Sequence, residues 1–283
     1  MSFEIILIFL TIIALFVASY SDIKQREVPD WVSYGLLFSA FGIRALASVD
    51  LGWKILLAGV LGFLPFLLIA YLFYYTDQWG GGDSKLLMGM GAVLGITYPL
   101  TDHSFVILWF FLALLFIGAL WGIIWMVFEA LRNKEVFIEK FRLSILGYKK
   151  MHWLLLTMTF IFLGLSFFFN FILYFSFFPL AIFYLCTFVN AVEKSCFYHH
   201  ITPSKLTEGD WLAQNITLGG KKMMVKRTLG AGDIKELRLL HKKGKLETVL
   251  IKEGVPFIPS FLFAYLFILF GEKIMAMILK MVF

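Results

Sequence analysis

The 283-residue sequence contains little charge and almost no cysteine. Only 16% of its residues are Asp, Glu, Lys or Arg, whereas 60% are apolar and 33 are Phe. Ordinary globular chains are about 25% charged, so a soluble fold could not cover this much apolar surface. The composition therefore excludes a soluble enzyme, a disordered chain and a nucleic-acid-binding protein. We predict an integral membrane protein.

Sequence motifs for bound groups are also missing. The two cysteines, Cys186 and Cys196, are too few for a four-thiolate metal site or a disulfide framework. The five histidines include no H-E-x-x-H spacing for zinc, and no nucleotide-binding loop occurs. We therefore expect neither a metal nor a cofactor, and no nucleic-acid partner.

Long apolar runs fill most of the chain, and about 17–25 such residues suffice for one helix to cross a bilayer. We predict an α-helical polytopic membrane protein with about eight transmembrane helices. The count could fall to six, because 153–192 is one nearly continuous apolar stretch, which we divide at Asn170. The predicted spans are residues 3–21, 31–48, 53–75, 85–100, 104–128, 153–170, 171–192 and 255–271.

The basic residues orient these spans, because Lys and Arg concentrate in cytoplasmic loops. With the N-terminus outside, nearly all 25 basic residues lie in or beside inner segments. The expected location is therefore the plasma membrane, with the N-terminus outside. The four exceptions are Arg44, Lys54, Lys273 and Lys280.

Three regions follow along the chain. Residues 1–192 form a transmembrane catalytic bundle, which includes an interfacial amphipathic helix over 133–150. Residues 193–254 form a small cytoplasmic α/β module, in which a Gly-Gly turn separates two short strands. Residues 255–283 contain the last transmembrane span.

Two acidic residues are predicted to meet at the inner membrane face. Asp22 ends the first span and Asp83 begins the fourth, so the number of crossings brings both to the same side. Carboxylates near bilayer depth are costly and indicate function. Two adjacent carboxyls share one proton, which suits an aspartic-protease mechanism. Gly80, Gly81 and Gly82 precede Asp83 and allow close backbone approach.

Simpler roles for these residues remain open. Asp83 could be a helix cap, and Asp22 could be an ordinary solvated charge. Asp77 lies near the inner end of the third span and is a rival for the second carboxylate. A second G-x-G-D sequence, at 230–233, lies in the polar module, where we expect Asp233 to be the N-cap of a soluble helix.

The sequence resembles a known family at these positions. GGGD at 80–83 matches the G-x-G-D signature of intramembrane aspartic proteases. Asp22, followed by basic residues and Pro29, resembles the other aspartate motif of type IV prepilin peptidases, with the archaeal preflagellin (archaellin) peptidases most similar. The segment KEGVPFIPSFLFAYL at 252–266 is also similar to the C-terminal part of that family.

The resemblance implies an activity and a catalytic pair. Such enzymes remove the short basic leader of prepilin or preflagellin precursors at the cytoplasmic membrane face, with Asp22 and Asp83 as catalytic residues. Nothing in the sequence matches the zinc-binding cysteine domain of the bacterial enzymes that also methylate the new N-terminus, so we expect cleavage without methylation. Acidic residues near the pair should meet the basic leader; the candidates are Glu27, Asp30 and Asp77.

Two other functions are compatible with an acidic pair. A presenilin-like or signal-peptide-peptidase-like protease would place its first aspartate on the helix immediately before the G-x-G-D helix and would carry a later Pro-Ala-Leu motif. Neither feature occurs here. A membrane transporter could use the pair for a cation path, but its site is expected near the midplane and not at one face.

Overall fold

A computed structural model describes residues 3–76, 78–218 and 221–282, which divide into two compact units. The first contains residues 1–123 and 255–283, and the second contains residues 124–254. The division between them falls inside one long helix, whereas the sequence suggested a boundary near 192. Helices beyond residue 133 pack on one another, which explains why they group with the module that follows them.

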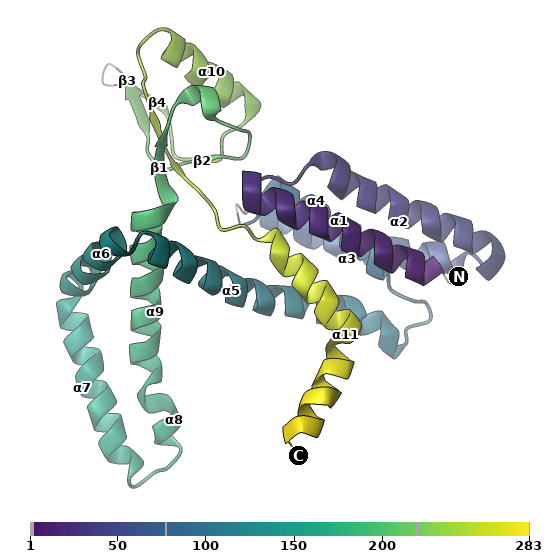
Figure 1. Cartoon of the computed structure of the whole chain (residues 1–283), viewed down its shortest axis with the longest axis horizontal. Coiled ribbons are helices and arrows are strands. Elements are labelled where there is room, and N and C mark those ends of the chain that lie inside the picture. Colours follow the sequence, from purple (N-terminus) through teal and green to yellow (C-terminus); the bar gives the residue numbers. More distant parts are fainter. Residues whose placement is uncertain (1–2, 77, 219–220, 283) are drawn as a thin grey trace. The chain divides into compact units, whose positions relative to one another are not determined.

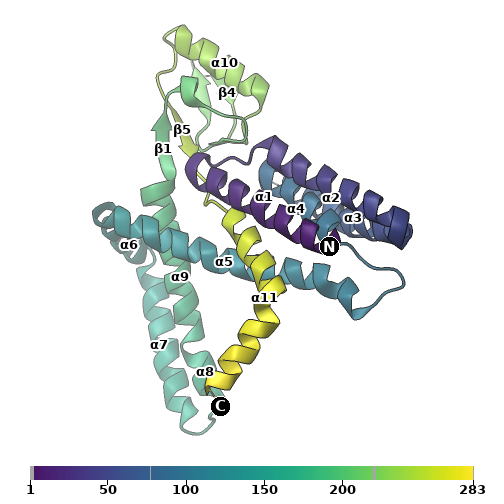
Figure 2. The ribbon, with the colours of Figure 1, turned by 45° about the vertical axis from the view of Figure 1, so that its right-hand side comes forward.

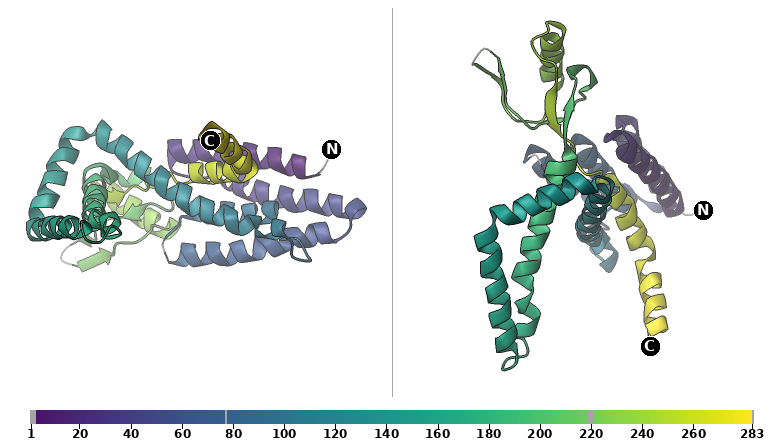
Figure 3. Two further views of the ribbon diagram at one scale, coloured as in Figure 1. Left: turned by 90° about the horizontal axis from the view of Figure 1, so that it is seen from below. Right: turned by 60° about the vertical axis from the view of Figure 1, so that its left-hand side comes forward.

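The first unit is a bundle of apolar helices with the N-terminal ones side by side (Figure 1; Figure 3, left). The last helix of the chain packs against the first (Figure 2). Its core includes Leu15, Leu36, Leu87, Phe110 and Phe261, all buried. The helices are α1 (Phe3–Gln25), α2 (Asp30–Leu51), α3 (Lys54–Tyr75), α4 (Gly81–Leu94), η1 (Asp102–Phe105), α5 (Val106–Arg132) and α11 (Ile258–Val282).

Glycines let α3 and α4 pack closely. Gly62 of α3 faces Gly91 of α4, and a Cβ atom added to Gly62 would lie 2.3 Å from the Gly91 carbonyl oxygen. Larger side chains would therefore force the two helices apart, as expected for small-residue packing between membrane helices. Gly95 ends α4 with φ +69°, a conformation that favours glycine.

The second unit begins in α5 and contains further helices followed by a small mixed module. The helices α7 and α9 lie alongside each other (Figure 3, right). The chain leaves regular helix between Ser166 and Ile172, around the point where the apolar stretch was divided. The helices are α6 (Lys134–Gly147), α7 (Lys149–Ser166), α8 (Ile172–Ser176), α9 (Phe178–Val192) and η2 (Glu193–Phe197).

The module contains two small antiparallel sheets and one helix. β5 lies between β1 and β2, with Tyr198 opposite Lys252 and Ile201 opposite Val249, while β3 pairs with β4. The predicted Gly219-Gly220 turn lies outside the described residues. The elements are β1 (Tyr198–Ile201), η3 (Pro203–Lys205), β2 (Trp211–Leu212), β3 (Ile216–Leu218), β4 (Lys221–Met224), α10 (Ala231–Lys242) and β5 (Val249–Lys252).

The protein is an α-helical polytopic membrane protein, as predicted, although fewer helices than eight meet the length and apolarity needed to cross a bilayer. Among the described residues five do so: α1, α2, α3, α5 and the stretch Ile172–Phe197. The 14 residues of α4 cover about 21 Å at 1.5 Å per residue, which is less than a hydrocarbon core of about 30 Å. The apolar part of α11, Ile258–Gly271, is similarly short.

Candidate active site

Asp22 lies in the last turn of α1 and is buried, with 8% of its surface exposed. The helix ends three residues later because Arg26 adopts φ +59° and its N–H donates to the Asp22 carbonyl oxygen at 2.9 Å. The chain then turns back, and the Ser21 hydroxyl donates to the Glu27 carbonyl oxygen at 2.8 Å. This turn places the positive charge of Arg26 where it acts on the Asp22 carboxylate.

Asp83 lies in the first turn of α4 and is partly buried. Gly80 is the N-cap, and its N–H donates to Asp83 Oδ2 at 3.2 Å. Asp83 therefore does cap its helix, but from the third helical position, because the residue at the N-cap has no side chain. A carboxylate in this place also interacts favourably with the helix dipole.

The two aspartates come together in the first unit. α1 contacts α4, and the charge of Asp22 acts on the Asp83 carboxyl group. A Cβ atom added to Gly82 would lie 3.0 Å from Val28 Cβ, so the glycine lets the turn after α1 rest on the start of α4. Gly81 has no such requirement, since its Cβ would make only an ordinary contact at 3.7 Å with Tyr74.

The third element at this site is α11. The backbone N–H of Ile258, its first residue, donates to Asp22 Oδ2 at 2.9 Å. Ile258 is fully buried, so this hydrogen bond is shielded from water. The acidic pair is thus bounded by the end of α1 and by the beginnings of α4 and α11.

The acidic residues predicted to meet a basic leader differ in their surroundings. Glu27 is exposed in the turn after α1. Asp30 begins α2 and forms an ion pair with Lys85 of α4 at 2.5 Å. The side chain of Asp30 is nevertheless 65% exposed, so water and other cations reach it. Asp77 lies outside the described residues.

The second G-x-G-D sequence repeats the local geometry of the first in the other unit. Gly230 is the N-cap of α10, and its N–H donates to Asp233 Oδ2 at 3.1 Å. The prediction that Asp233 itself is the N-cap was therefore wrong by three positions, although it does cap the helix. Its other oxygen pairs with Arg227, so the partner of Asp233 is a cation and not a second carboxylate.

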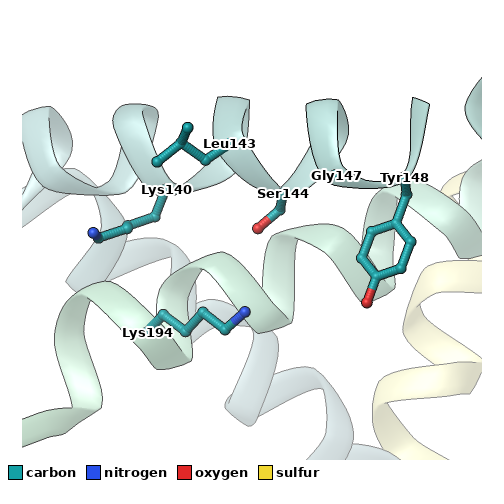
Figure 4. A pocket seen from close by; sticks show the side chains of 6 residues that line it. All are labelled: Lys140, Leu143, Ser144, Gly147, Tyr148 and Lys194. Atoms are coloured by element: carbon teal, nitrogen blue, oxygen red, sulfur yellow. The ribbon is translucent and has the colours of Figure 1, made fainter.

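A separate open cavity of about 480 Å³ lies in the second unit, beside α6 and η2 (Figure 4). It contains no acidic residue; the lining residues are Lys140, Leu143, Ser144, Gly147, Tyr148 and Lys194. The part of the chain that the structure describes holds no cluster of three or more His, Cys, Asp and Glu residues arranged for a metal ion. The site to be explained is therefore the Asp22–Asp83 pair.

Sequence reasoning missed the backbone donor of Ile258 and the supports around it. A backbone N–H leaves no mark in residue identity. The nearest signal is the Pro-Phe-Ile-Pro sequence at 256–259, directly before the last apolar run. Proline is common in the first turn of a helix because its φ angle is already close to the helical value, so this sequence indicates where the last helix begins.

Comparisons with known proteins match the part of the chain that carries the pair. Residues 9–123 match the model of the type IV leader peptidase family. The prepilin peptidase EppA of Methanothermobacter thermautotrophicus is 32% identical over 110 residues, which are 37% of this chain and 28% of that protein. The preflagellin peptidase of Methanocaldococcus jannaschii is 34% identical over 87 residues, 29% of this chain and 35% of that protein.

A third relative, the preflagellin peptidase of Methanococcus maripaludis, is 30% identical over 87 residues, 29% of this chain and 36% of that protein. The matches thus span about a third of the length of these curated relatives. No solved structure matches significantly. The resemblance expected from the sequence is confirmed as a similarity: residues 9–123, with Asp22 and Asp83 among them, match the model of the type IV leader peptidase family.

Proposed function

We propose that this protein is a membrane aspartic endopeptidase that removes the short basic leader from prepilin- or preflagellin-type precursors. The observation that carries this proposal is the pairing of Asp22 with Asp83 inside the segment matched by the type IV leader peptidase family. The names of the three relatives support the same substrate class.

The proposed chemistry uses the two carboxyl groups and one water molecule. Two neighbouring carboxyls share one proton, so one is a carboxylate and the other a carboxylic acid. The carboxylate takes a proton from water, whose oxygen attacks the peptide carbonyl carbon, while the acid donates its proton to the carbonyl oxygen. The C–N bond of the tetrahedral intermediate then breaks as the leaving amine takes a proton from one carboxyl group. The other carboxylate takes a proton from a hydroxyl group of the intermediate, which gives the carboxylic acid product and restores the shared proton.

We place this reaction at the cytoplasmic face of the plasma membrane, with the N-terminus outside. The distribution of Lys and Arg supports this orientation. Both aspartates lie at helix ends, which is where a precursor anchored in the bilayer would present a leader emerging at the surface. Besides the precursor, the lipid bilayer is a partner of the protein, because it covers the large apolar side chains that are exposed on the helices.

The basic leader would be held by acidic side chains beside the pair, namely Glu27, Asp30 and Asp77. Asp30 already forms an ion pair with the ammonium group of Lys85. A lysine of the leader would therefore take the place of Lys85 as the partner of Asp30. Charge reversal at Glu27, which is exposed, should raise KM more than it lowers kcat; unchanged values of both would remove Glu27 from the site.

Cleavage of a precursor tests the proposal directly. Co-expression with a precursor carrying a class III signal peptide should give a shorter product on an immunoblot. Asp22→Asn and Asp83→Asn should each abolish that product, because an amide can neither share the proton nor activate water. Product formation by either variant would refute the proposed mechanism.

Asp233→Asn is the matched control for Asp83→Asn. Both residues stand third in the first turn of a helix and accept the N–H of an N-cap glycine. The same substitution therefore removes the same negative charge from the cap in both, while the Asn amide oxygen still accepts the N–H. Asp233→Asn should process the precursor normally, since Asp233 pairs with Arg227 and not with a carboxylate. Loss of processing in this variant would mean that capping, and not the acidic pair, explains the effect at Asp83.

A further inference from the structure

The start of α11 touches the acidic pair although it lies far from it in the sequence. The Ile258 N–H donates to Asp22 Oδ2 at 2.9 Å across 236 positions, and both groups are buried. The first N–H groups of a helix have no partner within the helix. Here the carboxylate of another helix supplies one, and the dipole of α11 favours a negative charge at this end.

The segment that presents this N–H is held from several sides within the first unit. The indole Nε1–H of Trp121, on α5, donates to the Pro256 carbonyl oxygen at 2.7 Å. The Phe257 ring packs against Trp79 at 5.4 Å between ring centroids. Gly118 leaves room for that ring, since a Cβ atom there would lie 2.4 Å from it.

The same aromatic contacts connect the two aspartates. Trp79 directly precedes the Gly-Gly-Gly run that leads into Asp83, and it packs on both Phe257 and Phe261. Phe257 in turn precedes Ile258, the residue bound to Asp22. A shift of the segment before α11 would therefore disturb the supports of both carboxyl groups.

We propose that the start of α11 is a third component of the catalytic centre, in which the Ile258 N–H orients Asp22 and Trp121 holds that N–H in place through Pro256. Ile258 and Trp121 are positioning residues. The inference rests on the proposed function. In this arrangement Asp22 Oδ2 accepts the backbone N–H of Ile258. The other oxygen, Oδ1, is therefore the one that takes the proton from water.

Removal of the Ile258 N–H tests the first part. Ile258→Pro deletes the donor, and proline is tolerated at the first position of a helix. Ile258→Ala is the control, because it also truncates the buried side chain but keeps the N–H. With a purified precursor, kcat of Ile258→Pro should be about tenfold to hundredfold below that of Ile258→Ala, at equal KM, as expected for a hydrogen bond to a charged group. Equal kcat values would overturn the proposal.

Trp121 offers an independent test that leaves the backbone intact. Trp121→Phe removes the indole donor, and kcat should fall severalfold without a change in KM. Trp121→His restores a ring N–H at similar reach and should recover part of the loss. Trp109→Phe is the control on the same helix, since Trp109 is 62% exposed, and it should match the wild type. Failure of His to exceed Phe at position 121 would count against the role of the N–H.

The two levels of the proposal fail in different ways. If the unmodified protein cleaves no precursor, or cleaves it without need of Asp22, the proposed function is wrong. If cleavage depends on Asp22 but Ile258→Pro equals Ile258→Ala, the function stands and the role of α11 is wrong. Melting temperatures of the five variants, measured in the same detergent, identify any loss of kcat that follows from unfolding.

Discussion

At the scale of single residues, Asp83 and Asp233 show what a G-x-G-D sequence does by itself. Each begins a helix whose N-cap is the first glycine, and each accepts that glycine's N–H. The motif therefore specifies a helix start with an acidic side chain near it, which is a local property. What distinguishes Asp83 is its partner, Asp22, and that partner comes from the tertiary packing.

Gly82 is required by its packing against Val28, which the G-x-G-D motif alone does not indicate. Gly82→Ala should place a methyl group 3.0 Å from Val28 Cβ, and such overpacking typically costs about 1–3 kcal/mol. We expect a lower melting temperature and reduced precursor cleavage, because the turn after α1 must move away from α4 and take Asp22 with it.

Two variants make the Gly82 prediction specific. Gly81→Ala has room for its methyl group and should behave like the wild type or better, as alanine favours helix by about 1 kcal/mol. The double variant Gly82→Ala with Val28→Gly removes both close contacts, those with Val28 Cβ and Cγ2, and should regain activity. If Gly81→Ala were as damaging as Gly82→Ala, the flexibility of the three glycines at 80–82 would explain the loss of activity, and the contact with Val28 would not.

At the scale of elements, Arg44 fixes the end of the helix that begins with Asp83. Arg44, on α2, is 6% exposed. Its guanidinium donates to the carbonyl oxygens of Ala92 and Val93 at the end of α4, at 2.8 and 2.7 Å, and to that of Ile55 on α3 at 3.1 Å. One side chain thus joins three helices, and it satisfies carbonyl groups that a helix end leaves without partners.

Arg44→Met should therefore lower the free energy of unfolding by about 3 kcal/mol or more, since it leaves buried carbonyls without donors. Arg44→Lys should recover little, because an ammonium group cannot reproduce the planar fork of donors. Lys54→Met is the control for loss of a nearby charge, as Lys54 is exposed. Thermal melts of the four proteins in one detergent decide the matter, and a melting temperature for Arg44→Met equal to that of Lys54→Met would contradict it.

At the scale of the whole molecule, the sequence predicts well those features that depend on apolar composition and on the number of membrane crossings. The membrane class follows from composition, and the approach of Asp22 and Asp83 follows from the number of crossings between them. The helix count did not follow, because apolarity continues to Leu100 while Gly95 ends α4. Apolar runs report burial in lipid, and backbone conformation decides where a helix stops.

Long-range polar contacts were beyond sequence reasoning for a different reason. Arg44 was an unexplained basic residue at the outer side, and only its three carbonyl partners explain it. Asp30 was assigned to a substrate, whereas it also pairs with Lys85 across 55 positions. The Ile258 donor belongs to the backbone. Each of these contacts depends on which helices meet, and periodicity in the sequence does not encode that.

The division of the chain into two units leads to a last prediction. The module in the second unit has its own core, in which Leu237 of α10 is fully buried with Leu212 and Leu229, whereas the residues placed around the acidic pair all lie in the first unit. Leu237→Ala should cost the module about 2–5 kcal/mol and speed amide hydrogen exchange over residues 198–252. Cleavage of a precursor should nevertheless keep its kcat, because no group at the pair comes from this core.

Leu239→Ala, on the same helix but 57% exposed, should leave both exchange and cleavage unchanged. If kcat of Leu237→Ala fell in step with the loss of protection, the module would take part in catalysis, and the catalytic centre would extend beyond the first unit.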